Sequence, residues 1–174
     1  MASIARSLRP VASRLAMTAR VSGRAASWQA SSLGLRSFSA SKTVQVKKYT
    51  KDHEWIDLSE DGKTGVIGIS DYAAHALGDV VYVELPTVPM EVAAGDSIGA
   101  VESVKSASDI NSPISGTITA VNSLLEEKPG TINKGPEDES SAGGWMAKIE
   151  VGDAGIKDMD GLMDAKQYKE FTEE

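Results

Sequence analysis

One lysine, set among small side chains, is the position in this chain best suited to chemistry. The residues around it are Ser103, Val104, Lys105, Ser106, Ala107 and Ser108. Such neighbours leave room for a modifying enzyme to close over the amine. A catalytic lysine is instead usually desolvated, because burial lowers its pKa. The composition indicates a modification site, although most lone lysines in serine-rich turns are only solvated surface residues.

Two short apolar segments flank this lysine and must position it. Residues 98–101 and 114–121 are rich in β-branched side chains and are bounded by glycine and proline. This composition is typical of β-strands. We therefore expect Lys105 at an exposed reversal between two strands, with its backbone held on both sides.

Most of the remaining chain has the composition of short strands between turns. We expect strands over 55–58, 64–69, 80–85, 117–121 and 145–151, the first two joined by a hairpin turn at 59–62. Ser70 is expected to cap a short helix that ends at Gly78. The loop 133–144 is rich in Gly, Pro, Ser and acids, which predicts a mobile surface segment.

Two further helical segments carry capping signals. Ser123 and Glu126 have the spacing of a capping box for one helical turn, and Asp164 and Gln167 have it for a C-terminal helix. Tyr168 and Phe171 share a face of that last helix, and we expect them to dock it on the domain.

The segments 95–103 and 116–123 resemble each other, which predicts a weak internal repeat around Lys105. Together these features predict a mainly β fold, a flattened β-barrel or sandwich with short peripheral helices and a C-terminal helix. The chain after residue 38 is long enough for one domain with its own core.

The N-terminus differs sharply in composition from the rest. The first 51 residues contain no Asp or Glu, and all six arginines fall within the first 36. Ile4, Leu8, Val11 and Leu15 recur at helical spacing with the arginines off this stripe. Such a leader is typical of a mitochondrial transit peptide and predicts a location in the mitochondrial matrix. A basic arm for nucleic acid or a membrane surface is the alternative, and the abrupt change to an acidic chain disfavours it.

Two processing sites fit the end of this leader. Cleavage after Phe38 would start the mature protein at Ser39. Cleavage after Ser37, followed by removal of eight residues, would start it at Val46. We therefore divide the chain into a transit peptide over 1–38, or to 45, and a folded domain over 46–174, and the sequence leaves both starts open.

Removal of the leader makes the protein strongly acidic. Twelve lysines remain against 25 acids, a net charge of −13. Phosphate would be repelled by such a surface, so we expect no nucleic-acid partner, and no apolar run reaches the roughly 20 residues that span a bilayer. With no cysteine and only His53 and His75, we expect neither disulfides nor a metal site. Protein partners with basic docking faces are favoured.

The residues around Lys105 resemble the lipoyl-lysine region of the glycine cleavage H-protein family. The similar run extends from Glu102 past Ser108 and Asp109 to Gly116, and Gly95 and Asp96 upstream also match the wider biotinyl/lipoyl carrier superfamily. Further similar stretches are 49–55, 68–73, 77–86 and 144–149. The resemblance therefore covers the chain from about Tyr49 to its C-terminus.

This resemblance implies a barrel-sandwich hybrid of the lipoyl-domain type and a non-catalytic carrier in the glycine cleavage system. Lipoate, bound as an amide to Lys105, would supply the chemistry. The arm would take the aminomethyl group of glycine from glycine decarboxylase (P protein) and present it to the aminomethyltransferase (T protein). Dihydrolipoyl dehydrogenase (L protein) would then reoxidise the dithiol. A lipoate-attaching enzyme would recognise the lysine's surroundings, namely Glu102, Ser103, Val104, Ser106 and Asp109.

A loaded arm carries a protonated amine that should need a shielded cleft with carboxylates. The candidates are Glu54 and Asp109, because Glu54 lies in the His53-Glu54-Trp55 signature and Asp109 follows Lys105 by four residues. A histidine of the first helix sometimes lines the family's cleft, but His75 lies one position from where it would align. The ordinary interpretation is that these acids are solvated.

Several alternatives stay open. A biotin carrier would have Met beside the lysine, where this chain has Val104 and Ser106. A lipoyl domain of a 2-oxo acid dehydrogenase would usually show Asp before the lysine and a catalytic domain downstream. A hydrolase has no spaced motif to support it, and a relay of lipoyl groups to other enzymes is not tested by sequence. Two departures from the family are Pro89, in place of an expected glycine, and the lengthened 133–144 loop, which lacks a Pro-Tyr pair.

Overall fold

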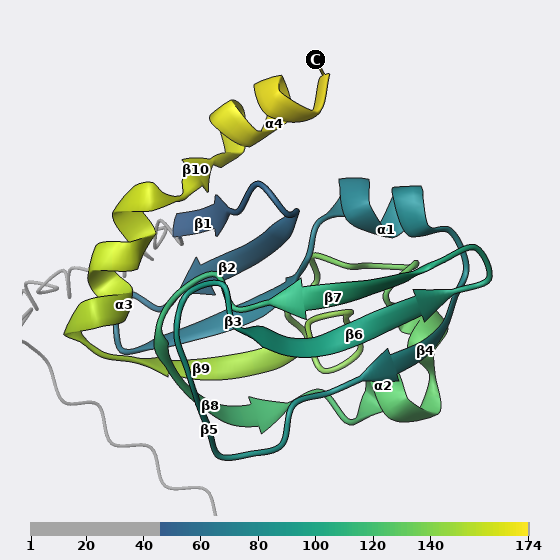
Figure 1. Ribbon diagram of the computed structural model, residues 1–174, viewed down its shortest axis with the longest axis horizontal. Coiled ribbons are helices and arrows are strands. Elements are labelled where there is room, and N and C mark those ends of the chain that lie inside the picture. Colours follow the sequence, from purple (N-terminus) through teal and green to yellow (C-terminus); the bar gives the residue numbers. More distant parts are fainter. Residues whose placement is uncertain (1–45, 174) are drawn as a thin grey trace, which may run out of the picture. The chain divides into compact units, whose positions relative to one another are not determined.

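Two antiparallel β-sheets pack face to face in the computed structural model, which describes residues 46–173. The larger sheet has the strand order β10-β1-β2-β3-β9-β8-β5, and the smaller has the order β4-β6-β7 (Figure 1). The strands are β1 Val46–Tyr49, β2 Glu54–Leu58, β3 Thr64–Ile69, β4 Val80–Glu84, β5 Met90–Val92, β6 Ser97–Ser103, β7 Ala107–Asn111, β8 Gly116–Val121, β9 Ala147–Val151 and β10 Met163–Asp164. The expected mainly β sandwich is confirmed.

The core lies between the two sheets and is built from alternate strand residues. Ile56 and Ile67 of the larger sheet and Val101 of the smaller sheet are fully buried, and Ile110 is only 3% exposed. Because side chains alternate across a strand, the intervening residues face outward. Each buried aliphatic side chain contributes roughly 1.5–3 kcal/mol, so this core fixes the register of both sheets.

Short helices cover the edges of the sandwich. They are α1 Asp71–Leu77, α2 Leu124–Glu127, α3 Asp153–Asp158 and α4 Ala165–Glu173, with single turns η1 Pro129–Thr131 and η2 Met159–Gly161. The cap predicted for α1 is confirmed, because the Ser70 side chain accepts a hydrogen bond from the Ala73 N–H. Gly78 ends this helix at a φ of 80°, a value that favours glycine. No helix in the described part of the chain is long and apolar enough to cross a membrane.

The two predicted capping boxes have opposite outcomes. Asp164 and Gln167 form theirs, since each backbone N–H donates to the other's side chain, at 2.9 and 2.8 Å. Ser123 does not, because its own backbone is helical and its side chain makes no capping bond. The helix α2 forms nonetheless, and the capping prediction for it was wrong.

The strand before Lys105, β6, pairs with a different strand from the one that we expected. We predicted residues 114–121 as that flank, but β7 at 107–111 pairs with β6 directly after the lysine. Ser108 and Ile110 point inward while Ala107 and Asp109 point outward, an alternation concealed by small polar side chains. Residues 116–121 form β8 in the other sheet. The strands β1, β5 and β10 and the helix α3 were also not predicted.

The loop 133–144 is held against the larger sheet, contrary to the mobile segment that we expected. The Tyr49 hydroxyl donates to the Glu137 carboxylate at 2.8 Å, and the Lys47 amine donates to the Glu137 carbonyl at 3.0 Å. The Trp55 indole donates to the Pro136 carbonyl. Burial, together with the Glu137 carboxylate, holds the pKa of Tyr49 well above its usual range.

Two carboxyl groups meet where this loop crosses β2. Asp57 is only 5% exposed, and its Oδ1 finds no hydrogen-bond donor among the described residues. Burial, followed by a hydrogen bond with Asp57, raises the pKa of Glu139 to about 7. Lys47 lies 3.6 Å from Glu139, and Lys148 lines the same small cavity. Burial beside Asp57 therefore favours the protonated form of Glu139 near neutral pH.

This pair should make stability depend on pH. The pKa of Glu139 rises from 4.5 to about 7 on folding, so the folded state binds the extra proton in that interval. The free energy of unfolding should therefore fall as pH rises from about 4.5 to about 7. We expect a loss of about 1 kcal/mol, since Glu139 is partly exposed. Urea unfolding of Glu139→Gln should lack most of this slope, whereas Glu126→Gln should retain it. An equal slope in both variants would contradict the raised pKa of Glu139.

The leader predicted at 1–38, or to 45, lies outside the described residues.

Candidate functional site

The hairpin of β6 and β7 presents Lys105 at its tip. Ser103 closes the turn, because its hydroxyl accepts from the N–H groups of Lys105 and Ser106, both at 3.1 Å, and donates to the Ser106 carbonyl. Lys105 and Ser106 are exposed, and Val104 is 68% exposed. The amine is therefore in solvent while the backbone beneath it is fixed.

A turn that follows α1 supports the hairpin from one side. The Val104 N–H donates to the Asp79 carbonyl at 3.1 Å. The Lys105 side chain lies over Gly78, where a Cβ atom would meet its Cε and Nζ atoms at 3.3 Å. The lysine tip and α1 thus lie at the same end of the sandwich (Figure 1).

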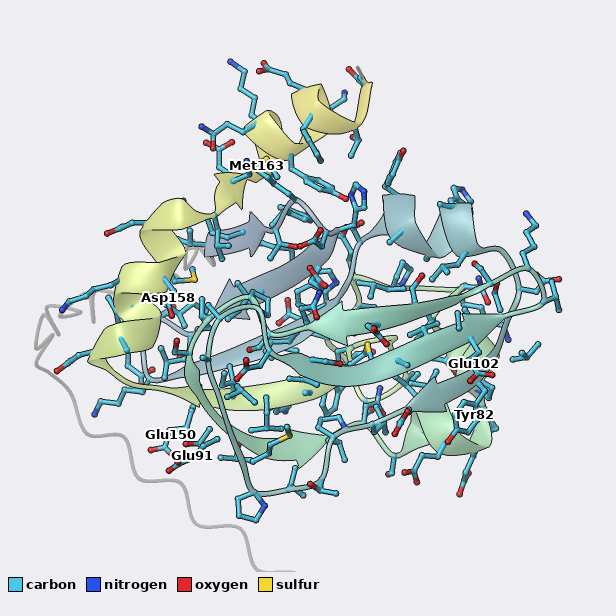
Figure 2. The ribbon with its side chains drawn as sticks, viewed as in Figure 1. Tyr82, Glu91, Glu102, Glu150, Asp158 and Met163 are labelled. Atoms are coloured by element: carbon cyan, nitrogen blue, oxygen red, sulfur yellow. The ribbon has the colours of Figure 1, made fainter. Side chains whose placement is uncertain are left out.

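The outer face of the smaller sheet is acidic near the lysine. Glu102 pairs with Tyr82 on β4, and both side chains are exposed and close together in Figure 2. Glu84 and Asp109 pair across Ala100 on the same face. Both acids line a surface hollow of about 280 Å³.

A cavity of about 240 Å³ lies beside the lysine, on the other side of β7. Its walls are Ile69 of β3, Ala73, Ala76 and Leu77 of α1, and Ser106, Ser108 and Ile110 of the hairpin, with Asp52 and His53 completing the lining. The walls are largely apolar, and the polar groups come from the hairpin and from the turn before β2. A flexible chain attached at Lys105 could lie in this cleft.

The residue at one edge of this cavity has an unusual backbone conformation. His53 has a φ of 74°, which is uncommon for a residue other than glycine. Its Nδ1 lies 2.8 Å from the Tyr168 hydroxyl, which in turn lies 2.6 Å from the Ser70 hydroxyl. Its ring also packs against Tyr72, with centroids 4.7 Å apart. The C-terminal helix α4 therefore fixes the His53 ring at the cleft.

Glu54 is buried beneath this region rather than facing the cavity. It is 1% exposed, and one carboxylate oxygen accepts from the Asn111 N–H of β7 at 3.0 Å. The other accepts from the Thr50 hydroxyl. The carboxylate thereby joins the start of β2 to β7 across the two sheets.

The structure brings some of the predicted site residues together and separates others. Glu102, Ser103, Val104 and Ser106 all adjoin Lys105 on the hairpin. Asp109 lies on the opposite face of β7 from the cavity, and Glu54 is buried without lining it, so neither predicted acid is part of this cleft. His75 is exposed on α1 and is absent from the cavity lining, where Ala76 takes part instead.

Sequence reasoning missed Asp52 and Ser108 as cleft residues. Asp52 directly precedes the quoted His53-Glu54-Trp55 signature, and Ser108 lies three residues after Lys105. The alternation along β7 would have placed Ser108 inward and Asp109 outward, had the strand been recognised. No feature of the sequence predicts the left-handed backbone conformation of His53.

A β-sandwich with an exposed lysine at the tip of a hairpin, beside a cleft, has the architecture of a carrier domain. Comparisons with known proteins identify the family to which this carrier domain belongs. The family model for the glycine cleavage H-protein matches residues 47–174.

Individual relatives agree with that match. The chain is 50% identical over 127 residues to the glycine cleavage system H protein of Teredinibacter turnerae, covering 73% of this chain and 92% of the relative. It is 46% identical over 151 residues to the mitochondrial glycine cleavage system H protein 2 of Arabidopsis thaliana, covering 87% and 91%. The crystal structure of a glycine cleavage system H protein from Mycobacterium marinum superposes with a TM-score of 0.59 at 37% identity, covering 72% and 95%.

The chain therefore belongs to the glycine cleavage H-protein family. Its function is that of a non-catalytic lipoyl carrier in the glycine cleavage system. Relatives from Arabidopsis thaliana and Saccharomyces cerevisiae are named as mitochondrial proteins.

Proposed function

We propose that Lys105 is the residue that carries lipoate, through an amide bond to its side-chain nitrogen. The observation that supports this assignment is the hairpin tip, where an exposed amine stands on a backbone fixed by Ser103 and Asp79. Small neighbours leave access for the lipoate-attaching enzyme. Glu102, Ser103, Val104, Ser106 and Asp109 form the surface that this enzyme would meet.

The residues beside Lys105 also suit the attached group. Lipoate would supply the dithiolane that takes up the aminomethyl group, and the residues around Lys105 would hold its arm. Ile69, Leu77 and Ile110 provide apolar contact for a hydrocarbon arm, and the cavity of about 240 Å³ admits one. The arm would reach the cavity past Ser106, which is both next to Lys105 and part of the lining.

The partners follow from the proposed sequence of events. Glycine decarboxylase, the aminomethyltransferase and dihydrolipoyl dehydrogenase would each meet the same lysine tip in turn. The chain from Ser39 has a net charge of −13, and Glu84, Glu102 and Asp109 lie on the outer face of the smaller sheet. Partner surfaces with lysine and arginine would be attracted to this face and would find it quickly.

Replacing the acceptor tests the assignment. Lys105→Arg should fold normally, since an exposed lysine contributes little to stability. It should take up no lipoate from a lipoate-attaching enzyme, as followed by intact mass. Lys134→Arg, at another exposed lysine, is the matched control and should be modified like the unaltered chain. Lipoate on the Lys105→Arg protein would overturn the assignment.

We also propose that the cleft beside Lys105 shelters the amine borne by the loaded arm. Asp52 is the carboxylate that lines this cavity, and the hydroxyls of Ser106 and Ser108 lie on its other wall. A protonated amine is held more strongly by a carboxylate in a partly enclosed cavity than in free water. Glu54 holds the cleft in shape, because its carboxylate joins β2 to β7.

The decay of the loaded carrier tests this holding site. Asp52→Asn should leave lipoylation unchanged but speed loss of the aminomethyl group from the isolated protein by about three- to tenfold, since a partly exposed charged hydrogen bond is lost. Asp109→Asn, on the opposite face, should leave the decay rate unchanged. Glu54→Gln tests whether the link that Glu54 makes between β2 and β7 is needed for the cleft. Equal decay in the Asp52→Asn and unaltered proteins would contradict the proposal.

We further propose that residues 1–38, or 1–45, direct the protein into the mitochondrial matrix and are removed there. The six arginines, the absence of acids and the mitochondrial relatives support this. N-terminal sequencing of the protein from isolated mitochondria should give Ser39 or Val46 as the first residue. A mature chain that still begins near Met1 would contradict import with removal of a leader.

A further inference from the structure

Asn133 is an exposed residue whose side chain is committed to the backbone of a distant turn. Its Nδ2 donates to the Gly78 carbonyl at 2.7 Å, and its Oδ1 accepts from the Val80 N–H at 2.9 Å. The Asn133 amide group therefore binds the residues on both sides of Asp79, which lies more than 50 positions earlier in the sequence. Two short hydrogen bonds to one turn make the contact specific.

The turn that Asn133 holds is the one on which the lysine hairpin rests. Asp79, at its centre, accepts a hydrogen bond from the Val104 N–H at 3.1 Å. The Lys105 side chain lies directly over Gly78. Any rotation of the 78–80 backbone would therefore move the group that anchors Val104 and the surface beneath the lysine.

The Gly78 N–H donates to the Ala74 carbonyl at 3.2 Å and Val80 pairs with Ser103, but the turn also contains a residue with wide conformational freedom. Gly78 follows the last turn of α1 with a positive φ, and glycine is the residue with the widest choice of backbone conformations. Asn133 itself is well placed to act as a brace. It follows Ile132, which is fully buried, and the Ile132 N–H donates to the carbonyl of Pro129, the first residue of η1.

We propose that Asn133 is a positioning residue for the Lys105 hairpin: its side-chain amide fixes the 78–80 turn and so sets the orientation in which enzymes meet the lysine tip. The part of this proposal that concerns modification rests on Lys105 as the lipoyl acceptor. The part that concerns the backbone does not, because the hydrogen bonds join groups within this chain. Each part can be measured separately.

Two substitutions separate the two hydrogen bonds. Asn133→Asp keeps the shape and the acceptor for Val80 but places a carboxylate oxygen against the Gly78 carbonyl, where the two oxygens repel. Asn133→Ala removes both bonds. Lys134→Ala changes the neighbouring exposed residue, whose side chain has no hydrogen bond in the described part of the chain. Ser59→Ala removes comparable exposed bonds at the 59–64 turn, and it controls for general loss of stability.

Amide hydrogen exchange of the unlipoylated protein is the direct readout. We expect the Val104 amide to exchange about tenfold faster in Asn133→Asp and Asn133→Ala, because the bond to Asp79 opens more often. The Asn111 amide, which donates to Glu54, should exchange at an unchanged rate. Both amides should be unaffected in Lys134→Ala and Ser59→Ala. Unchanged Val104 exchange in both Asn133 variants would overturn the proposal.

Lipoylation kinetics supply the second readout. If only a fraction of molecules presents the tip correctly, the KM for the acceptor protein should rise about threefold or more in the Asn133 variants while kcat stays nearly constant. If the KM rose only because less protein was folded, Ser59→Ala would raise it too, in proportion to its own loss of stability. Faster Val104 exchange with unchanged KM would overturn the positioning role. If the unaltered chain takes no lipoate at Lys105, the proposed function fails, and the exchange data still decide whether Asn133 braces the turn.

Discussion

An amine that several enzymes must meet in turn has to be exposed, while the backbone that bears it has to stay in place. In this domain both demands are met by one hairpin, whose base is buried and whose tip is solvated. Ile98, Val101 and Ile110 fix β6 and β7 in the core at 0–3% exposure. From that base the Ser103 hydroxyl closes the turn at Lys105. The rest of the sandwich can be understood as what keeps this hairpin in register.

Contacts from distant segments hold the hairpin to its surroundings. The buried Glu54 carboxylate joins β2 to β7, and the Asp79 carbonyl holds Val104. Removing the partner of a buried polar group is costly, so the Glu54 contact stabilises the junction of β2 and β7. On the other side of the cleft, α4 places Tyr168 against His53 and Ser70. The cleft is thus bounded by elements from three separate parts of the chain.

Local signals in the sequence were sufficient for much of this architecture. Ser70 and Gly78 delimit α1 through capping chemistry that depends only on neighbouring residues, and Asp164 with Gln167 does the same for α4. The strand before Lys105 was likewise predictable from its β-branched residues and glycine, but the strand after it was not, because β7 and not 114–121 pairs with β6. The family resemblance, which rests on residues 49–149, correctly indicated the carrier function.

Features that depend on long-range contacts could not be predicted in this way. The strand β7 is short and polar, and only pairing with β6 makes it a strand. The loop 133–144 has the composition of a mobile segment, yet Tyr49, Lys47 and Trp55 hold it in place. Spacing from Lys105 suggested Asp109 for the cleft, but the side-chain alternation of β7 turns it to the outer face. Asp52 was passed over because a single acid before a strand has no distinguishing pattern.

The central claim is that one lysine, at the tip of the β6–β7 hairpin, bears the lipoyl group in the cell. The most direct test is fragmentation mass spectrometry of the protein isolated from its own mitochondria, without added lipoate or enzyme. The account predicts one lipoyl group per chain, and fragment ions that assign it to Lys105. A lipoyl group on any other lysine, or a mature protein that carries none, would contradict the account.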